Sequence, residues 1–466
     1  MVGKVLEWIA PRWTLRRKLA QQAIRTLKAA ETGPSQSSWV RVGDGPNAPP
    51  FERKVIVARA NRLYLDDPYV HGLVNLMVNR IVGPGSRLRA TTSDSSFNAY
   101  AERAFVAWMD DCDLYQEMTF AEIERLLVIK RMLDGGVFIR KRVEKDGRRG
   151  VPKIEILEYS RLQEIGAVSS GNSVYDGVEV DATGRVVAYH FSRPSAGMTS
   201  FATVRVPASE ILHISSFRRP GQYLGLPEIT PIIPYCMHLS EIIEAELINK
   251  KVEACLGVAI KQSDLFTRAA VAEQVEGETT RAISLSPGGV YHLLPGEEIQ
   301  VIDPKRPGSQ FMDFAGAILQ AFGRPFGVSR EMITGNKSEV NYSSARHSEL
   351  EFRQFIEPYR RQIRNGFLRP IYRWAMEVMA DFGELRVPAN LRDSLAYLSH
   401  TWIHRGAEWV DPQKEAEAKQ KKLDMCLTTL EREASELGLD WRELARQRAA
   451  EIRFLGGLGI GGGDAE

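Results

Sequence analysis

The sequence predicts an α+β fold, in which helical segments lie on both sides of one antiparallel β region. Between residues 135 and 217, short segments alternate apolar and polar residues and are separated by turns such as "DGRRG" and "DATGR". With 466 residues, of which 44% are hydrophobic, the chain is apolar enough to fold around a substantial core. Outside the β region, apolar residues recur at helical spacing, for example Val70, Leu73, Val74, Met77 and Ile81.

The first part of the chain is predicted to be a linker followed by helices. Residues 31–52 are rich in Gly, Pro and Ser and are expected to form a linker or an extended arm. The helical pattern that follows ends at "VGPG", because Gly83 and Gly85 favour positive φ and Pro84 cannot continue a helix. Two more helices are predicted before the β region, near 96–111 and 119–134.

After the β region the pattern is mainly helical. A long helix is predicted from about residue 226 to 255, with Pro231 and Pro234 in a first turn or an early kink. An irregular stretch that ends in short strands precedes further helices at 309–325 and at about 341–380. A short β segment, "GELRVPANL", and at least two helices from Asp411 onward complete the chain before its glycine-rich tail.

Composition excludes several classes of protein. The chain has 61 Lys and Arg against 59 Asp and Glu, and its net charge of +2 argues against a histone-like coat for nucleic acid. Its four cysteines lie far apart without a CxxC pair, which indicates reduced thiols of a cytoplasmic protein, not a disulfide frame or a zinc site. No run approaches the roughly 18 apolar residues of a membrane span, so no membrane contact is predicted.

The glycines of "GPNAPPF" and "GGVFIR" form no GxGxxG or GxxxxGK[ST] motif for nucleotide binding, and the catalytic motifs GxSxG and HExxH are absent. A histidine such as His213 is expected to be a packed side chain, and the acids Asp66 and Asp67 to lie at a solvated helix end. Ser344 fits a helix N-cap better than a nucleophile. We therefore predict no catalytic residue, no metal and no cofactor. A cytoplasmic α+β enzyme with a dispersed active site stays an alternative.

Four stretches, in order from about residue 55 to 455, carry a resemblance to a known family. They are "RANRLYLDDPYVHGLVNLMVNRIVGPGSRLRA", "GQYLGLPEITPIIPYCMHLSEIIEAELI", "FGVSREMITGNKSEVNYSSARHSELEFRQFIEP", and "WVDPQKEAEAKQKKL" with "LTTLEREASELGLDWRELARQRAAE". Together they resemble the portal proteins of tailed bacteriophages, lambda family, and "NYSSAR" is the most specific element. The part before residue 50 departs from the family pattern, which puts the contacts of the arm in doubt.

The resemblance implies a portal fold, with a wing of helices and antiparallel β-strands, a two-helix stem, a small α/β clip and a helical C-terminal crown. The implied segments are an N-terminal arm at 1–52, the first part of the wing at 53–225, the first stem helix at 226–261, the clip at 262–308, the second stem helix at 309–326, a tunnel loop at 327–342, the long helix with the rest of the wing at 343–410, and the crown with a flexible tail at 411–466.

The resemblance also implies a function without catalysis. Portals form a ring, expected here to have twelve subunits, at one capsid vertex, where the terminase large subunit packages double-stranded DNA and where DNA exits on ejection. Such a ring nucleates procapsid assembly with the major capsid and scaffold proteins and later binds a head-completion or adaptor protein. The protein is then expected in the virion, and in the host cytoplasm during assembly. The equivalent ring of a gene transfer agent or a defective prophage is the closer alternative.

Two sets of site residues follow from the resemblance. The residues expected to face the DNA channel, without sequence preference, are Asn336, Lys337, Ser338, Asn341 and Arg324. The residues expected in the clip, where the terminase would dock, are Lys261, Asp264, Arg268, Glu273, Glu276 and Arg281. One Lys337 per subunit would give a ring of charge, which is weak enough to let DNA slide.

The long helix after the tunnel loop is expected to brace it. Ser343 or Ser344 would cap the helix, and Glu349 and Arg353, four residues apart, would form a supporting pair on an exposed face. Pro358 would bend the helix or end its first segment.

Overall fold

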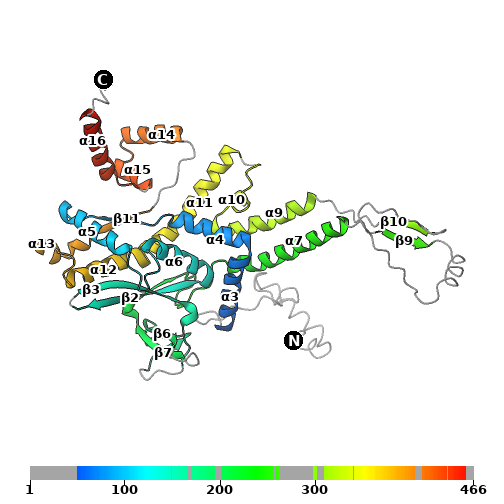
Figure 1. The fold of residues 1–466 in the computed structure, drawn as a ribbon, viewed down its shortest axis with the longest axis horizontal. Coiled ribbons are helices and arrows are strands. Elements are labelled where there is room, and N and C mark those ends of the chain that lie inside the picture. Colours follow the sequence, from blue (N-terminus) through cyan, green and yellow to red (C-terminus); the bar gives the residue numbers. More distant parts are fainter. Residues whose placement is uncertain are drawn as a thin grey trace, which may run out of the picture. The chain divides into compact units, whose positions relative to one another are not determined.

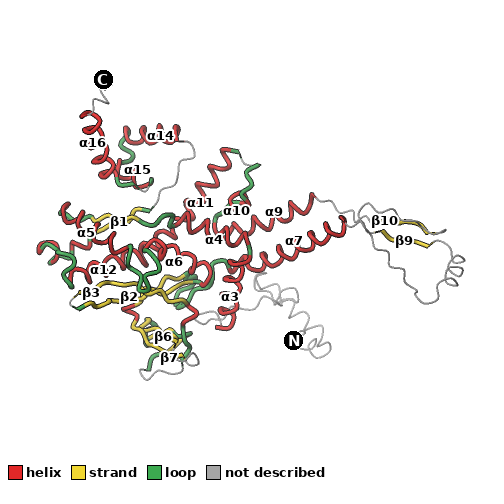
Figure 2. Tube along the Cα trace, viewed as in Figure 1, coloured by secondary structure: helices red, strands yellow, loops and turns green. Residues whose placement is uncertain are grey.

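The computed structural model describes residues 50–147, 149–165, 171–194, 201–254, 258–262, 297–301, 309–338, 341–404, 412–437 and 439–457. Residues 50–466 form one compact unit, and residues 1–49 of the predicted arm lie outside the described ranges. This unit contains both helices and antiparallel sheets, so the predicted mixture of helix and antiparallel sheet is confirmed (Figure 1 and Figure 2).

The described chain opens with two helices, α3 (Pro50–Asp66) and α4 (Pro68–Ile81), which are separated at Asp67. The Asp67 carboxylate accepts hydrogen bonds from the backbone N–H groups of Tyr69 and Val70, both at 2.9 Å, and thereby caps α4. The acidic pair at 66–67 therefore marks a helix boundary, as the sequence predicts, but Asp67 is buried and not solvated, at 8% exposure.

The "VGPG" turn after α4 has the predicted backbone conformation. The angle φ is +63° at Gly83 and +109° at Gly85. A Cβ atom at Gly85 would lie 2.8 Å from the Cβ of Ala121, so this position requires glycine for space as well as for φ. The chain continues through β1 (Arg87–Ala90), α5 (Ser95–Met109) and α6 (Phe120–Asp134), and both helices lie within a residue or two of their predicted bounds.

Strand β2 (Gly136–Asp146) is the centre of a three-stranded antiparallel sheet, between β3 (Arg149–Glu158) and β8 (Ile211–Ser215). Its apolar side chains serve two cores: Val137 and Ile139 pack in the main core, and Phe138 packs in a smaller one. Because both faces of β2 are buried, the strand begins with an uninterrupted apolar run and not with strict alternation.

A second antiparallel sheet covers the other face of β2 and closes the smaller core. It contains, in spatial order, β4 (Ser173–Tyr175), β5 (Val178–Val180), β6 (Val186–Pro194) and β7 (Phe201–Pro207). The antiparallel β region predicted for residues 135–217 is confirmed, and it is divided into two sheets.

The main core contains a cluster of aromatic rings from elements far apart in the sequence. The Phe120 ring stacks on Phe367 at a centroid distance of 5.1 Å and on Trp402 at 6.1 Å, while Phe105 meets Tyr372 edge-on at 5.1 Å. All five side chains are at most 5% exposed. These contacts tie the early helices to the C-terminal half of the unit, and Trp402 is a packing residue within it.

A small two-stranded sheet joins an early segment of this unit to a late one, and the sequence analysis did not predict it. Strand β1 pairs antiparallel with β11 (His400–Ile403), about 300 residues later, with Leu88 opposite Trp402. The prediction of a β segment at "GELRVPANL" is wrong. This stretch is a turn followed by the short helix α13 (Ala389–Arg392), which begins directly after Pro388.

Two long helices, α7 (Ile233–Ala254) and α9 (Ser309–Gly323), contact each other (Figure 1). The helix predicted from about residue 226 begins seven residues later, at Ile233, because the residues directly before it form the 3-10 helix η5 (Thr230–Ile232) and not the first turn of the α-helix. Pro234 lies in the first turn of α7, which confirms that interpretation. The span 226–261 is also not one helix, since β9 (Val258–Gln262) follows α7 and pairs with β10 (Glu297–Val301).

The long helical run at 341–380 is confirmed, but its irregularity is not where the sequence placed it. Helix α11 (Tyr342–Ile363) passes through the exposed Pro358, where water can satisfy the carbonyl that loses its partner. The break is the π-helical segment η7 (Arg364–Leu368), whose wider turn precedes α12 (Arg369–Asp381) and makes room for the ring of Pro370. The prediction that Pro358 ends a first segment is therefore wrong.

Three helices complete the described chain: α14 (Pro412–Asp424), α15 (Leu430–Glu436) and α16 (Trp441–Gly457). Charged groups tie them to β1, since Arg89 forms ion pairs with Glu431 at 3.1 Å and with Asp440 at 3.2 Å. None of the helices in the described part of the chain combines the length and the apolar character that a bilayer span requires.

Candidate functional site

The loop between α10 (Arg330–Thr334) and α11 holds most of the residues predicted to face DNA. Gly335 ends α10 with φ of +70°, and the Asn336 Oδ1 atom accepts a hydrogen bond from the Ser338 backbone N–H at 3.0 Å. Asn336, Lys337, Ser338 and Asn341 are all exposed, and residues 339–340 lie outside the described ranges. The loop is therefore polar and shaped mainly by its own hydrogen bonds.

Asn341, and not a serine, caps α11. Its Oδ1 atom accepts a hydrogen bond from the Ser344 backbone N–H at 2.8 Å, while its backbone is extended, with φ of −89° and ψ of 164°. The prediction that Ser343 or Ser344 caps the helix is wrong, because an asparagine two or three residues earlier already satisfies the free N–H group. Asn341 thus fixes the point at which the loop ends.

The start of α11 is anchored by charged and polar contacts. Glu331 of α10 accepts a hydrogen bond from the Ser348 hydroxyl at 3.0 Å. The Glu349 carboxylate accepts hydrogen bonds from both terminal nitrogens of Arg80, at 3.0 and 3.2 Å, and from Arg353 Nε at 3.4 Å. The predicted pair of Glu349 and Arg353 is confirmed, but the Glu349 side chain is only 13% exposed, so the pair does not lie on an exposed face.

Arg324, the fifth residue predicted to face DNA, lies in the turn between α9 and α10 and is exposed. The turn ends at Gly327, where φ is +64° and a Cβ atom would lie 2.8 Å from the Phe355 ring carbon Cγ. This close approach packs the turn against α11. Arg324 is one short helix before the loop in the chain, and its role toward DNA stays a prediction.

The predicted docking residues of the clip fall almost entirely outside the described ranges. Lys261 belongs to β9, opposite Glu298 of β10. Asp264, Arg268, Glu273, Glu276 and Arg281 lie outside the residues that the structure describes, so their role stays a prediction.

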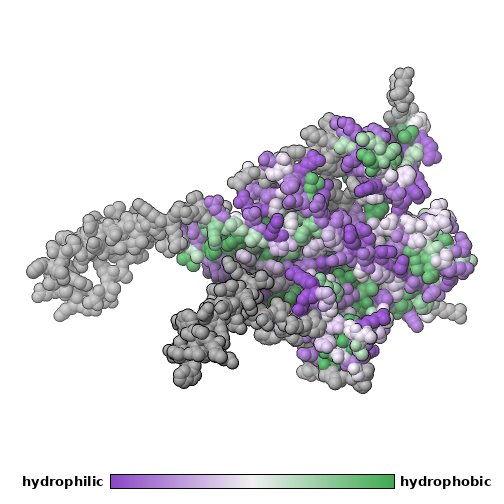
Figure 3. Space-filling view, turned by 180° about the vertical axis from the view of Figure 1, so that it is seen from behind, coloured by the Kyte–Doolittle hydropathy of each residue, from purple (hydrophilic) through white to green (hydrophobic). Residues whose placement is uncertain are grey.

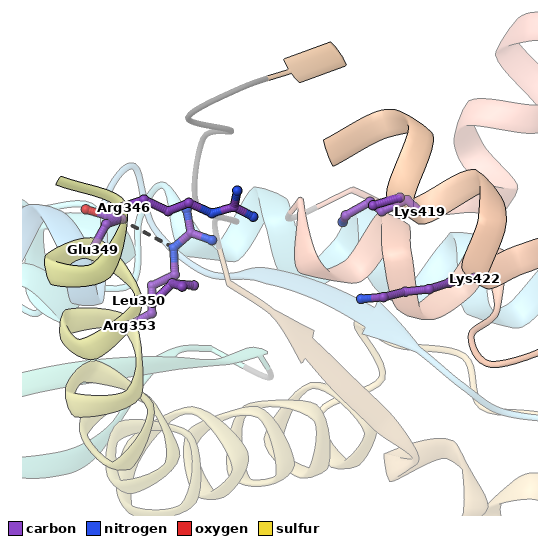
Figure 4. A pocket seen from close by; sticks show the side chains of 7 residues that line it. Arg346, Glu349, Leu350, Arg353, Lys419 and Lys422 are labelled. Carbon is purple, nitrogen blue, oxygen red and sulfur yellow. Dashed lines mark hydrogen bonds and ion pairs between the residues drawn. The ribbon is translucent and has the colours of Figure 1, made fainter. Parts of the chain in front are cut away.

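A basic cleft between α11 and α14 is a feature that the sequence analysis missed. Its volume is about 150 Å³, and Figure 4 shows side chains from the two helices facing each other across it. Spacings of three, four and seven residues place the lining groups on one face of each helix, which is the signal that could have found them. The groups are Arg346, Glu349, Leu350 and Arg353 from α11, and Lys419 and Lys422 from α14.

A buried ion pair connects α6, the segment before α7 and α11. The Arg131 Nε atom donates to Glu228 at 2.8 Å, and the Arg131 guanidinium carbon lies 4.5 Å from the centre of the Tyr359 ring. Arg131 is 7% exposed and Glu228 is 4% exposed, so each charge depends on the other. Through the Tyr359 ring, this pair links α6 to α11.

A second group of buried polar side chains joins Glu124 of α6 to Ser86, directly before β1, and to His404, directly after β11. The Glu124 carboxylate accepts hydrogen bonds from the Ser86 backbone N–H at 3.0 Å and from its hydroxyl at 2.6 Å, and Ser86 Oγ is 2.9 Å from His404 Nδ1. Burial raises the pKa of Glu124 to about 7 and lowers the pKa of His404 to about 3. Each of the three residues is at most 8% exposed, so substrate has no access to them.

Within the described ranges there is no group of three or more His, Cys, Asp or Glu side chains arranged to hold a metal ion. His213 is partly buried, lies 2.5 Å from the Tyr159 hydroxyl through its Nε2 atom, and has a pKa lowered to about 3 by removal of its ring from water. It is a packed histidine, as the sequence predicts.

Comparison with known proteins decides the family. Residues 32–360 match the family model described as "Phage portal protein, lambda family", which is more than half of the chain. The chain belongs to this family. It is 24% identical to the "Probable portal protein" of Halomonas phage phiHAP-1, over 94% of this chain and 88% of that protein. It is 21% identical to "Portal protein B" of Escherichia phage lambda, over 84% of this chain and 82% of that protein.

Solved structures similar to this portal protein include a chain from "Virion of native gene transfer agent (GTA) particle". The TM-score is 0.48 at 14% identity, over 83% of this chain and 93% of that chain. A chain from "Neck of native GTA particle computed with C12 symmetry" has the same score and identity, over 84% and 94%.

Proposed function

We propose that this portal protein assembles with copies of itself into a ring at one capsid vertex, through which a terminase packages double-stranded DNA and through which DNA exits on ejection. The observation that carries the proposal is the match to the portal family over residues 32–360. The same ring would nucleate procapsid assembly and attach the head to the tail. Because the family is a structural one, ATP hydrolysis is assigned to the terminase and no catalysis to this chain.

The described elements fit the regions of such a ring. Helices α3 to α6 with the two larger sheets would form the wing, and α7 and α9, which contact each other, would form the stem. Strands β9 and β10 would belong to the clip that meets the terminase. The run from α11 to α12 would back the tunnel loop, and α14 to α16 would form the crown.

Apolar side chains exposed on the stem helices support assembly. They are between 41% and 54% exposed, and Figure 3 shows hydrophobic surface over this region. A monomer gains nothing from such surface, whereas neighbouring subunits in a closed ring would bury it. The side chains are Tyr235, Met237, Ile243, Leu247 and Ile248 of α7 and Phe314 of α9.

The loop at 335–341 suits a contact with DNA that must slide. Its described side chains are exposed and polar, and Lys337 adds one positive charge per subunit. Repeated around a ring, this charge would contact phosphates without reading the bases, because phosphate contacts carry no sequence information.

A packaging assay tests the proposal. Capsids assembled with this protein and supplied with the cognate terminase should take up nuclease-protected DNA, and capsids assembled without it should take up none. Equal protection in both preparations would refute the proposal.

The loop is tested in the same assay by Lys337→Ala, which should change the packaging rate or DNA retention in a salt-dependent way. Lys421→Ala, which removes an exposed lysine from α14, is the matched control. If Lys337→Ala rings package and retain DNA like the wild type at several salt concentrations, Lys337 has no significant channel role.

A further inference from the structure

The proposed function uses the loop at 335–341 and the exposed apolar side chains of α7 and α9, but it gives no role to the basic cleft between α11 and α14. It gathers four cationic side chains, Arg346, Arg353, Lys419 and Lys422, around a cavity of about 150 Å³. Such a volume holds a phosphate-sized anion with a few waters, each of which occupies about 30 Å³ in the liquid.

The charge balance of the cleft is positive even after its ion pairs are counted. Glu349 is the lining carboxylate, and it is already held by Arg80 at 3.0 Å as well as by Arg353. Lys419 pairs with Glu433 of α15 at 2.6 Å. Glu433 also interacts electrostatically with Lys422, whereas Arg346 has no hydrogen-bonded or ion-paired partner among the described residues. Like charges that face each other across a narrow space repel, and an anion between them would remove this cost.

The donors are arranged around the cavity in a way that suits a tetrahedral oxyanion. In Figure 4 the Arg346 side chain and the Lys419 and Lys422 side chains extend toward one another from opposite walls. Guanidinium groups on one wall can donate in pairs to two oxygens, while ammonium groups on the other reach the remaining oxygens as point charges. Leu350 is the only large apolar side chain in the lining, so the cleft offers little anchorage to an apolar or aromatic peptide side chain.

We propose that the basic cleft binds a phosphate group of the DNA backbone. This inference rests on the proposed function, since DNA comes to the cleft only if it passes through a ring of these chains. The site lies on the helix that backs the loop, and Arg346 follows the capping Asn341 by five residues. It contains no arrangement that could read a base, so binding is independent of DNA sequence.

The experiment measures binding of a fluorescently labelled duplex of about 30 base pairs to the full-length protein over a series of NaCl concentrations. The double variant Arg346→Ala/Lys422→Ala removes two of the cleft cations. Its matched control is Arg361→Ala/Lys421→Ala, which removes two exposed cations from the same two helices outside the cleft.

The cleft variant should bind at least tenfold more weakly at about 50 mM salt, and the slope of log K against log salt should fall by about 1, since each phosphate contact contributes about 0.9 to the slope. The control should keep most of the wild-type slope. Equal losses in the two double variants would show diffuse attraction and overturn the inference, as would wild-type binding by the cleft variant.

Two further variants keep the test decisive if the double variant assembles poorly. Arg346→Lys/Lys422→Arg retains both charges and should retain the salt slope, and the single Arg346→Gln should lose about 1 from the slope. If the ligand is free inorganic phosphate, phosphate will raise the melting temperature of the wild type but not of the cleft variant, while DNA binding is equal in both. That result would overturn the assignment to DNA.

Imaging of the same samples separates this inference from the proposed function. Rings of the cleft variant that bind DNA like wild-type rings would refute the cleft alone. Wild-type protein that neither forms rings nor binds DNA would refute the proposed function itself.

Discussion

The two halves of the long helical run, α11 and α12, are held in different ways. Helix α12 is held by apolar burial: its inward side chains are at most 5% exposed, and they are Ile371, Tyr372, Ala375, Met376 and Met379. Helix α11 also buries Phe352 and Ile356 in this core, but charged groups hold it as well. Arg360 donates to the backbone carbonyls of Arg80 at 2.8 Å and of Ile81 at 3.2 Å, where it satisfies the end of α4.

This difference means that α12 anchors the run in the core, whereas the charged contacts of α11 respond to salt and to nearby anions. Apolar packing is insensitive to salt and fixes the position of α12 in the core. Contacts between partly exposed charges weaken with salt and respond to nearby anions. The end of the run that carries the loop and the basic cleft is therefore the end whose contacts can be adjusted, and the π-helical segment η7 lies between the two halves.

The largest effect is expected at a buried ring of η7, directly before the anchoring helix α12. Phe367→Ala removes a fully buried ring that stacks on Phe120, and it should lower the free energy of unfolding by about 4 kcal/mol. Chemical denaturation, followed by circular dichroism at a fixed protein concentration, measures this loss. Phe454→Ala, at a position that is 68% exposed, is the control and should change stability by about 0.5 kcal/mol or less. Comparable losses in both variants would contradict the comparison.

Breaking the buried ion pair of Arg131 and Glu228, which contacts α11 through Tyr359, should also lower stability strongly. Glu228→Ala leaves Arg131 buried without its carboxylate, which should cost about 3 kcal/mol in the same assay and show little dependence on salt. Glu244→Ala, at an exposed position of α7, should be close to neutral. A loss below about 1 kcal/mol that disappears at high salt would place this pair among ordinary surface pairs.

The buried carboxyl of Glu124, in α6, predicts that the free energy of unfolding depends on pH. Burial raises its pKa to about 7 in the folded protein from the ordinary value of 4.5, so the folded state holds the proton more tightly than the unfolded state. The resulting stabilisation is fully present below about pH 4.5 and is lost as the pH rises through about 7.

Glu124→Gln removes this titration. Relative to the wild type, the variant should gain on the order of 2 kcal/mol of stability when the pH is raised from about 5 to about 8. His404 titrates in the opposite sense, because its pKa is lowered by burial, but it is present in both proteins and cancels in the difference. A difference in unfolding free energy that stays constant between the two pH values would contradict a raised pKa at Glu124.

The smallest effect is expected at the exposed start of α11. Asn341→Ala removes the N-cap and should cost about 1 kcal/mol, whereas Ser344→Ala should cost less because it keeps the cap. Gln354→Ala, at an exposed position inside the same helix, is the control. If Ser344→Ala were the more damaging change in thermal unfolding, the cap would have been assigned to the wrong residue.

Local signals in the sequence predicted local structure well. Spacing predicted α5, α6 and α9, glycine and proline predicted the "VGPG" turn, and alternation predicted the antiparallel region. Some local predictions failed, such as the β segment at "GELRVPANL" and the serine cap of α11, and the features that the sequence did not reveal depend on partners far away in the chain. The pairing of β1 with β11 joins residues about 300 positions apart, and four-residue strands have too little pattern of their own to reveal it.

The candidate site shows the same limit. The pair of Glu349 and Arg353 was visible four residues apart, but Arg80 reaches Glu349 from a helix more than 260 residues earlier. The basic cleft needs two helices that the sequence does not place side by side. Arg131 and Glu228 were likewise invisible, because a buried ion pair has no spacing rule when its members belong to different elements.

Imaging of the purified full-length protein by negative stain, with its mass measured in parallel, tests the central claim most directly. The account predicts rings with a central hole and a mass close to twelve times the 52.3 kDa subunit, held together through the apolar surface of α7 and α9. A protein that stays monomeric or dimeric at high concentration, and also in the presence of its capsid and scaffold proteins, would contradict it.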